Sequence, residues 1–167
     1  MTGRRPSVVG ADTPEPPFPV YLKGLVSQGF GRGSKELGIP TANLPEDVAE
    51  SFGKSTESGI YYGWAAVGAC RDVYPMVMSF GWNPYYKNEK RSAEVHIIHK
   101  YEQDFYGEEL RVIVTGYIRA EKNYESLDAL IEDINTDIQV AQKSLARPQY
   151  LALRADPFVV PTTTTTA

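Results

Sequence analysis

The chain has 167 residues, of which 42% are hydrophobic and 23% charged, and its formal net charge is −4. This predicts one domain with its own core, and the acidic balance argues against broad binding to nucleic-acid phosphates. No stretch approaches the roughly 18 apolar residues of a membrane-spanning helix. The lone cysteine, Cys70, cannot form an internal disulfide, and the proline-rich start fits neither a secretory signal nor a mitochondrial presequence, so we expect a cytoplasmic protein.

The first structural signals are a proline-rich arm and a strand. Residues 1–19 contain five prolines and few apolar side chains, which predicts a flexible N-terminal arm. Residues 20–26 are rich in β-branched and aromatic side chains and predict a strand that leads into a glycine-rich stretch.

The stretch 29–43 carries four glycines, the cations Arg32 and Lys35, and three side chains with hard oxygens, Ser34, Thr41 and Asn43. Small residues with exposed N–H groups can hold an anion, and hard oxygens suit a cation such as Mg²⁺. A phosphate-binding loop is therefore one interpretation, and a surface loop between two strands is the other. The glycine spacing fits neither a Walker A loop, nor a dinucleotide fingerprint, nor a protein-kinase loop.

Further strands are predicted over residues 59–67, 75–81, 93–99 and 110–118, with a sixth short pairing segment near 41–44 and a helical turn within 46–54. Turns separate these strands, and no βαβ alternation occurs. The pattern predicts a mainly β fold, an antiparallel β-barrel over about residues 20–122.

A helix is predicted over about residues 126–147. Apolar residues recur at three- and four-residue spacing, Ser126 is the expected N-cap, and Pro148 ends the helix. The apolar stripe needs a partner, and the outside of the barrel is available. The stripe consists of Leu127, Leu130, Ile131, Ile134, Ile138, Ala141 and Leu145. The single domain is expected to span 20–155, followed by a disordered threonine-rich tail at 156–167.

Two motifs follow one another along the chain. The glycine-rich stretch ends in Gly38-Ile39-Pro40-Thr41-Ala42-Asn43, and a Gly81-Trp82-Asn83-Pro84 segment is followed by Glu94-Val95-His96. These motifs and their order resemble those of the riboflavin kinase family, and the resemblance covers roughly residues 21–145. The resemblance implies a six-stranded antiparallel Greek-key β-barrel with a C-terminal amphipathic helix packed on it.

The resemblance makes Glu94 the catalytic base that takes or orients the proton of the riboflavin 5′-hydroxyl. By alternation Glu94 shares a face with His96, which is a rival base, and the alternative for Glu94 is an edge-strand side chain that points to water. The resemblance also makes Thr41 and Asn43 ligands of Mg²⁺ or another divalent ion such as Zn²⁺ or Mn²⁺. Turn chemistry after Pro40 is the alternative for this pair.

The resemblance implies two substrate pockets. Those residues expected to bind ATP are Gly29, Gly31, Ser34, Lys35, Pro40, Thr41, His99, Phe105 and Tyr106, and those expected to bind flavin are Trp82, Asn83, Tyr85 and Arg119. An ordinary hydrophobic corner is the alternative for His99, and a solvated cation at a strand end is the alternative for Arg119. Lys87, Lys90 and Arg91 are interpreted as a solvated charge run.

The predicted function is transfer of the ATP γ-phosphoryl group to riboflavin, giving FMN and ADP, by a monomer that binds neither nucleic acid nor membrane. Nineteen residues before the first strand are too few for the FMN adenylyltransferase domain of larger bacterial relatives, so one activity is expected. The alternatives are a flavin-binding barrel without catalysis and an oligonucleotide-binding barrel, which the acidic net charge disfavours.

Overall fold

The computed structural model describes residues 5–28, 41–68, 72–82, 90–99, 108–122 and 124–160. Within these ranges, antiparallel strands form one sheet in the order β1-β7-β4-β5-β6-β3-β2. The strands are β1 (Val20–Leu25), β2 (Ser27–Gln28), β3 (Thr41–Asn43), β4 (Gly59–Val67), β5 (Tyr74–Trp82), β6 (Arg91–Ile97) and β7 (Glu109–Arg119). The helices are α1 (Glu46–Gly53), α2 (Leu127–Leu145), α3 (Pro148–Leu151) and the 3₁₀ helix η3 (Ala152–Ala155).

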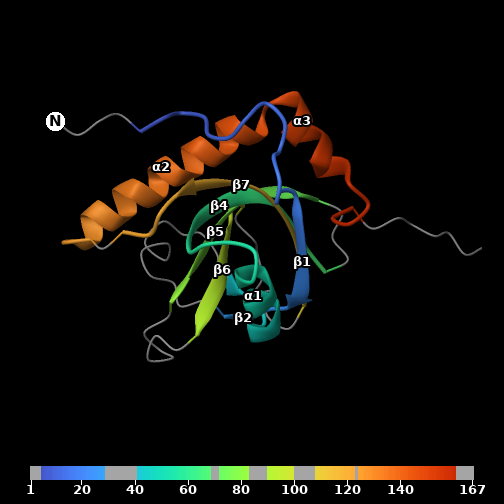
Figure 1. Ribbon diagram of the computed structural model, residues 1–167, viewed down its shortest axis with the longest axis horizontal. Coiled ribbons are helices and arrows are strands. Elements are labelled where there is room, and N and C mark those ends of the chain that lie inside the picture. The colour runs from blue at the N-terminus through green and yellow to red at the C-terminus, as the bar shows by residue number, and fades with distance from the viewer. Residues whose placement is uncertain are drawn as a thin grey trace, which may run out of the picture.

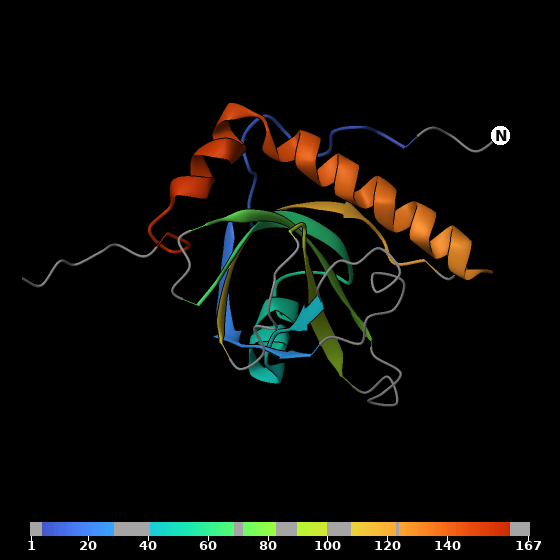
Figure 2. The same ribbon diagram turned by 180° about the vertical axis from the view of Figure 1, so that it is seen from behind.

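The sheet has a Greek-key core and curls on itself. Strands β4, β5 and β6 pair in succession, and β7 returns to pair with β4. β1 and β2 stand at opposite ends of the strand order, although Val26 alone separates them in the chain. The two ends of the sheet must therefore meet, which gives the curled shape seen from both sides in Figures 1 and 2.

Alternation along the strands divides the apolar side chains between two cores. Met76, Met78 and Phe80 of β5 belong to the interior of the curl, whereas Val77 lies on the outer face. Helix α1 closes the interior on the side away from α2 (Figure 1), where its buried Phe52 joins the same cluster. Both faces of the sheet are thus covered, which explains why β4 is buried along its whole length.

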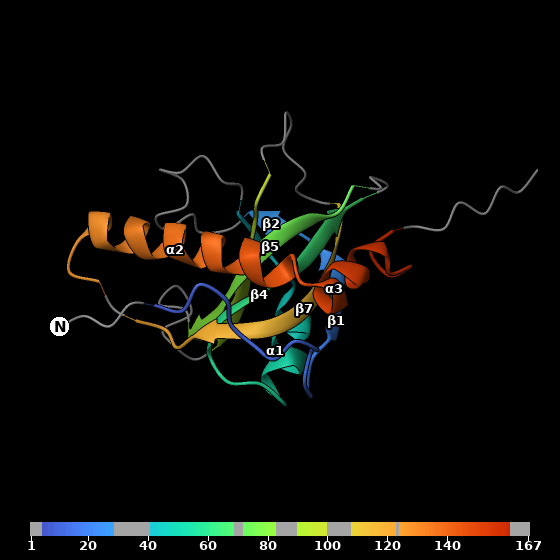
Figure 3. The same cartoon turned by 90° about the horizontal axis from the view of Figure 1, so that it is seen from above.

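Helix α2 lies across the outer face of the sheet (Figure 3). Its N-cap is Ser126, whose Oγ accepts a hydrogen bond from the Ala129 N–H at 3.1 Å. The second half of the helix packs on the sheet through Ala141 and Leu145. The first half is less covered, and Leu127 is 52% exposed.

The structure confirms the predicted mainly β class, the antiparallel Greek-key arrangement and the helix on its outside. β2 adds a two-residue strand to the six that were predicted. The packed part of the chain extends past the expected boundary at residue 155, because Val159 is buried and the Phe158 ring lies 5.1 Å from that of Tyr21. Within the described ranges, none of the helices has the length and apolarity needed to cross a lipid bilayer.

Candidate active site

Four polar side chains meet on the outer face of the sheet, where β3 pairs with β6. Thr41 stands opposite His96, and Asn43 stands opposite Glu94. Directly opposed residues of an antiparallel pair project to the same side. The intervening Ala42 and Val95 belong to the interior core, so the four polar groups project outward. They are the predicted base, its rival and the two predicted metal ligands. Folding brings all four together.

Glu94 and His96 are buried and lie in contact. Glu94 is 9% exposed and His96 7%, and His96 Nε2 lies 3.3 Å from Glu94 Oε1. Strand β6 lies between β5 and β3 in the sheet. The alternative of an edge-strand glutamate pointing to water is therefore wrong. Burying a carboxylate is costly unless it is paired, and His96 supplies the partner.

Asn43 is suited to binding a cation. Its Oδ1 is buried and has no hydrogen-bond partner among the described residues. An amide oxygen, the Thr41 hydroxyl and a nearby carboxylate are all hard donors of the kind that Mg²⁺ prefers. No cluster of three or more His, Cys, Asp or Glu side chains that could hold a metal occurs in the described part of the chain. A cation here would need further oxygen ligands, such as those of a phosphate.

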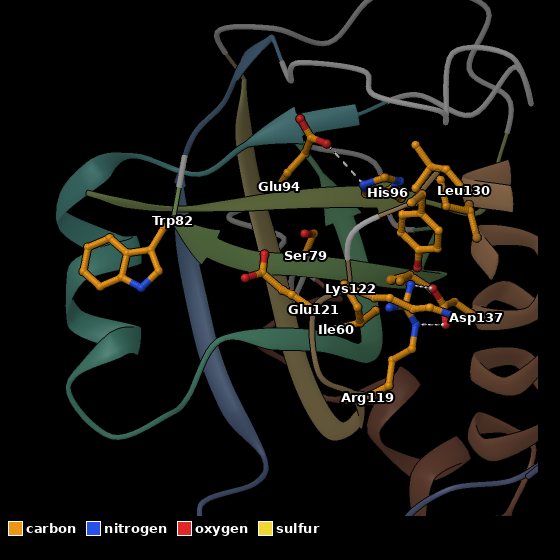
Figure 4. A pocket seen from close by; sticks show the side chains of 13 residues that line it. Ile60, Ser79, Trp82, Glu94, His96, Arg119, Glu121, Lys122, Leu130 and Asp137 are labelled. Atoms are coloured by element: carbon orange, nitrogen blue, oxygen red, sulfur yellow. Dashed lines mark hydrogen bonds and ion pairs between the residues drawn. The ribbon is translucent and has the colours of Figure 1, made fainter. Parts of the chain in front are cut away.

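A cavity of about 530 Å³ lies beside Glu94, between the sheet and the first half of α2 (Figure 4). Its walls combine apolar and ionisable side chains from four strands, α2 and the segment that joins β7 to α2. The lining residues are Ile60, Val77, Ser79, Trp82, Glu94, His96, Arg119, Glu121, Lys122, Tyr124, Leu130, Ile134 and Asp137. This explains the exposed start of α2, since that end of the helix is the cavity wall.

Arg119 is fixed at one wall of this cavity by Asp137 of α2 (Figure 4). Its Nε donates to Asp137 Oδ1 at 2.9 Å and its Nη2 donates to Oδ2 at 2.8 Å. Burial by itself would lower the pKa of Arg119, but the hydrogen bonds and charge of Asp137 outweigh it and raise that pKa. Arg119 is therefore a firmly charged, oriented group, and the alternative of a solvated strand-end cation is wrong.

Trp82 stands at the other side of the cavity, and the residue is 53% exposed (Figure 4). The Arg91 guanidinium lies 5.3 Å from the Trp82 ring centroid and 4.6 Å from that of Phe80. Arg91 also donates to the Gly53 carbonyl at 3.0 Å. The interpretation of Arg91 as part of a solvated charge run is therefore wrong, because it packs on two rings.

A family model described as riboflavin kinase matches residues 16–145. The chain belongs to the riboflavin kinase family. The riboflavin kinase of Pyricularia oryzae is 52% identical, over 90% of this chain and 84% of that protein. That of Homo sapiens is 54% identical, over 84% of this chain and 90% of that protein. The crystal structure of riboflavin kinase from Trypanosoma brucei matches with a TM-score of 0.66 and 30% identity, covering 87% of this chain and 92% of that one.

Membership of the riboflavin kinase family confirms the assignment made from the motifs. It also favours an enzyme over the non-catalytic flavin-binding barrel. The match begins at residue 16, so most of the N-terminal arm lies outside the part shared with the family model.

Several residues predicted to bind substrates lie outside the described ranges. These are Gly29, Gly31, Ser34, Lys35 and Pro40 for ATP, Phe105 and Tyr106 for ATP, and Asn83 and Tyr85 for flavin. His99 is described, and its ring stacks on that of Tyr74 with centroids 3.8 Å apart. Its predicted contact with adenine stays a prediction.

Other site residues were missed by the sequence analysis. Asp137 is the most informative, since it is 2% exposed on the sheet-facing side of α2, where an amphipathic helix is expected to be apolar. Asp137 stands three residues after Ile134 and four before Ala141, so the spacing places a carboxylate within the apolar stripe of the helix. That placement could have identified it from the sequence. Glu121 gave no such signal. Its carboxylate lies against Gly81, where any Cβ would collide with it.

Proposed function

We propose that this chain is an ATP:riboflavin 5′-phosphotransferase in which Glu94 is the catalytic base. The observation that carries this is the buried Glu94–His96 pair opposite Asn43 and Thr41, at the wall of a cavity large enough for a small molecule. Ligand cavities in proteins are typically about 300–1,000 Å³. The product is FMN, with ADP leaving.

The flavin ring system is proposed to lie between the sheet and the first half of α2. Ile60, Leu130 and Ile134 supply apolar wall for its faces, and Trp82 offers an exposed aromatic surface. Arg119 supplies an oriented donor for the polar edge of the ring. With the ring there, the ribityl chain extends along the cavity toward Glu94.

The chemistry requires positioning more than covalent participation by the protein. Phosphoryl transfer passes through a loose transition state, so catalysis consists mainly of alignment and charge stabilisation. Glu94 accepts a hydrogen bond from the ribityl 5′-hydroxyl and takes its proton as the oxygen bonds to the γ-phosphorus and the bond to ADP breaks. His96 holds the Glu94 carboxylate in place through the 3.3 Å contact.

Thr41 and Asn43 are proposed to bind the divalent cation through the Thr41 hydroxyl and Asn43 Oδ1. When bound, the cation supplies charge that offsets the phosphate oxygens of ATP. The orphaned Asn43 Oδ1 supports this assignment. The proposed ATP contacts at residues 29–40 rest on the motif alone.

The test is conversion of riboflavin to FMN by the purified protein with ATP and Mg²⁺, with and without EDTA. Glu94→Gln keeps the size of the side chain and removes its basicity, so kcat should fall by about 10²–10⁴-fold while riboflavin still binds. Glu94→Asp is the matched control, which should retain more activity because a carboxylate remains.

Two results would contradict parts of the proposal. Equal FMN formation by Glu94→Gln would move the base elsewhere, with His96 as the next candidate. Flavin binding by the wild-type protein with no FMN under any metal condition would support the carrier function instead.

A further inference from the structure

The N-terminal arm runs beside α2 (Figures 1 and 3). Hydrogen bonds between side chains and the backbone of the arm hold it there. The Val9 N–H donates to Ser144 Oγ at 3.1 Å, and the Val9 carbonyl accepts from Tyr62 and Arg147 at 2.7 and 2.8 Å. Tyr150 donates to the Ala11 carbonyl at 2.6 Å. Side chains fixed in the outer core therefore hold this segment, in contrast to the flexible arm expected from its composition.

The docked arm brings Arg5 to the acidic face of α2. Arg5 Nη2 donates to Asp137 Oδ1 at 2.5 Å, and Nη1 donates to Asp133 Oδ1 at 3.2 Å. Asp137 Oδ1 is the same oxygen that accepts from Arg119 Nε. Two guanidinium groups, from segments more than a hundred residues apart, thus share one buried carboxylate.

Because Arg5 and Arg119 share the Asp137 carboxylate, Arg5 affects how the Arg119 guanidinium is held at the cavity. An isolated Arg119–Asp137 pair is formally neutral. Arg5 brings a second positive charge to the Asp137 carboxylate, and Asp133, which also pairs with Arg5, brings a second negative one. In a partly buried setting such charges are poorly screened, so the position of Arg5 beside Asp137 influences how strongly Asp137 holds Arg119. Arg5 also holds the Asp137 carboxylate in place, and Asp137 in turn orients Nε and Nη2 of Arg119.

A second carboxylate gives Arg5 an independent hold on α2. Burial by itself would raise the pKa of Asp133, but the hydrogen bond from Tyr124 and the charges of Arg119, Arg5 and Lys122 lower it. Tyr124 donates to Asp133 Oδ2 at 2.8 Å. Arg5 therefore joins a charge network that also includes two groups of the cavity wall, Lys122 and Tyr124.

We infer that Arg5 is a positioning residue for the flavin site, acting on Arg119 through the shared Asp137 carboxylate. The N-terminal arm, most of which lies outside the family match, thereby belongs to the substrate site of this chain. This inference rests on the proposed role of Arg119 in binding the flavin. A plain structural clip that only fastens the arm is the competing explanation.

The experiment is a double-mutant cycle on the full chain, with the KM for riboflavin, the KM for ATP and kcat measured for each variant. Arg5→Gln should raise the KM for riboflavin about 3- to 10-fold, with little change in the KM for ATP. Arg5→Lys should recover part of the loss because it restores the charge. In an Arg119→Met background, Arg5→Gln should have no further effect.

Tyr150→Phe is the matched control. It removes one hydrogen bond to the arm and leaves Arg5, Asp137 and Arg119 intact, so the KM for riboflavin should stay at the wild-type value. Thermal unfolding of every variant checks that the chain still folds.

Each failure has a separate signature. If Arg119→Met leaves the KM for riboflavin unchanged, the proposed flavin contact of Arg119 is wrong. If Arg119→Met raises it but Arg5→Gln does not, or if the two effects multiply independently, the inference about Arg5 is overturned. If Tyr150→Phe raises the KM for riboflavin as much as Arg5→Gln, the arm is a structural clip.

Discussion

Asn43 carries a side-chain oxygen that destabilises the fold. Its Oδ1 is buried without a partner among the described residues, and a buried acceptor without a hydrogen bond costs stability. A buried acceptor of this kind is tolerated where a bound ligand supplies the missing interaction. We interpret the missing partner as the divalent cation of the proposed reaction.

Asn43→Leu tests this interpretation. Leucine has a similar size and removes the unpaired oxygen, so the free energy of unfolding should change by less than about 1 kcal/mol in either direction. FMN formation should nevertheless fall at least about tenfold and need more Mg²⁺ for half-maximal rate. Chemical denaturation and a metal titration of activity check the two parts. Wild-type Mg²⁺ dependence in Asn43→Leu would remove Asn43 from the metal site.

Helix α2 performs two tasks with one apolar stripe. Leu145, near its end, is buried in the outer core, whereas Leu130, near its start, lines the cavity. The sequence pattern is the same at both places, because periodicity records only which face is apolar. What covers each part of that face depends on where the sheet ends beneath the helix.

A pair of leucine truncations separates these tasks. Leu145→Ala should cost about 2–5 kcal/mol of unfolding free energy and leave the KM for riboflavin unchanged. Leu130→Ala should cost about 1 kcal/mol or less, since its side chain is partly exposed, and raise the KM for riboflavin roughly tenfold. Denaturant unfolding and steady-state kinetics of both variants are needed. The reverse pattern would mean that the flavin lies elsewhere.

At the scale of the whole molecule, Tyr61 in the interior core and Tyr124 at the cavity wall both have hydrogen-bonded hydroxyl groups. Burial first, and then the charge of Glu57, raises the pKa of Tyr61 to about 12. Burial and the hydrogen bond to Asp133 likewise raise the pKa of Tyr124 to about 12. These hydroxyl groups therefore keep their protons in the folded chain at pH values where an unfolded chain, with a pKa of 10.0, has lost them.

Stability should consequently fall on the alkaline side. The raised pKa values contribute stability that is complete below pH 10, and it is lost as the pH rises from 10 to about 12. Tyrosinate absorbance and near-ultraviolet circular dichroism should show a first group of tyrosines titrating near pH 10 and a second titrating as the fold is lost. Titration of all tyrosines near pH 10 with unchanged dichroism would contradict this.

Local patterns were enough to predict most elements and which side chains share a face at one half of the candidate site. Alternation within 93–99 placed Glu94 and His96 on one face, and the spacing of Thr41 and Asn43 placed that pair on one face as well. Ser126, Pro148 and the apolar spacing between them predicted α2 closely, because caps and periodicity depend on neighbours in sequence. The short strand β2 was not predicted, because two residues are too few to show the alternation of apolar and polar side chains that marks a strand.

The sequence by itself determined the chemistry that is available, namely a glutamate, a histidine and two side chains with hard oxygens, in motifs that resemble those of riboflavin kinases. Only the tertiary structure decided that β3 and β6 pair in the register that sets Asn43 opposite Glu94. It also decided that Asp137 joins Arg119 to Arg5 across 18 and 132 positions of the chain. Such contacts follow from how the sheet curls and where α2 and the arm dock, and no local pattern of side chains encodes them.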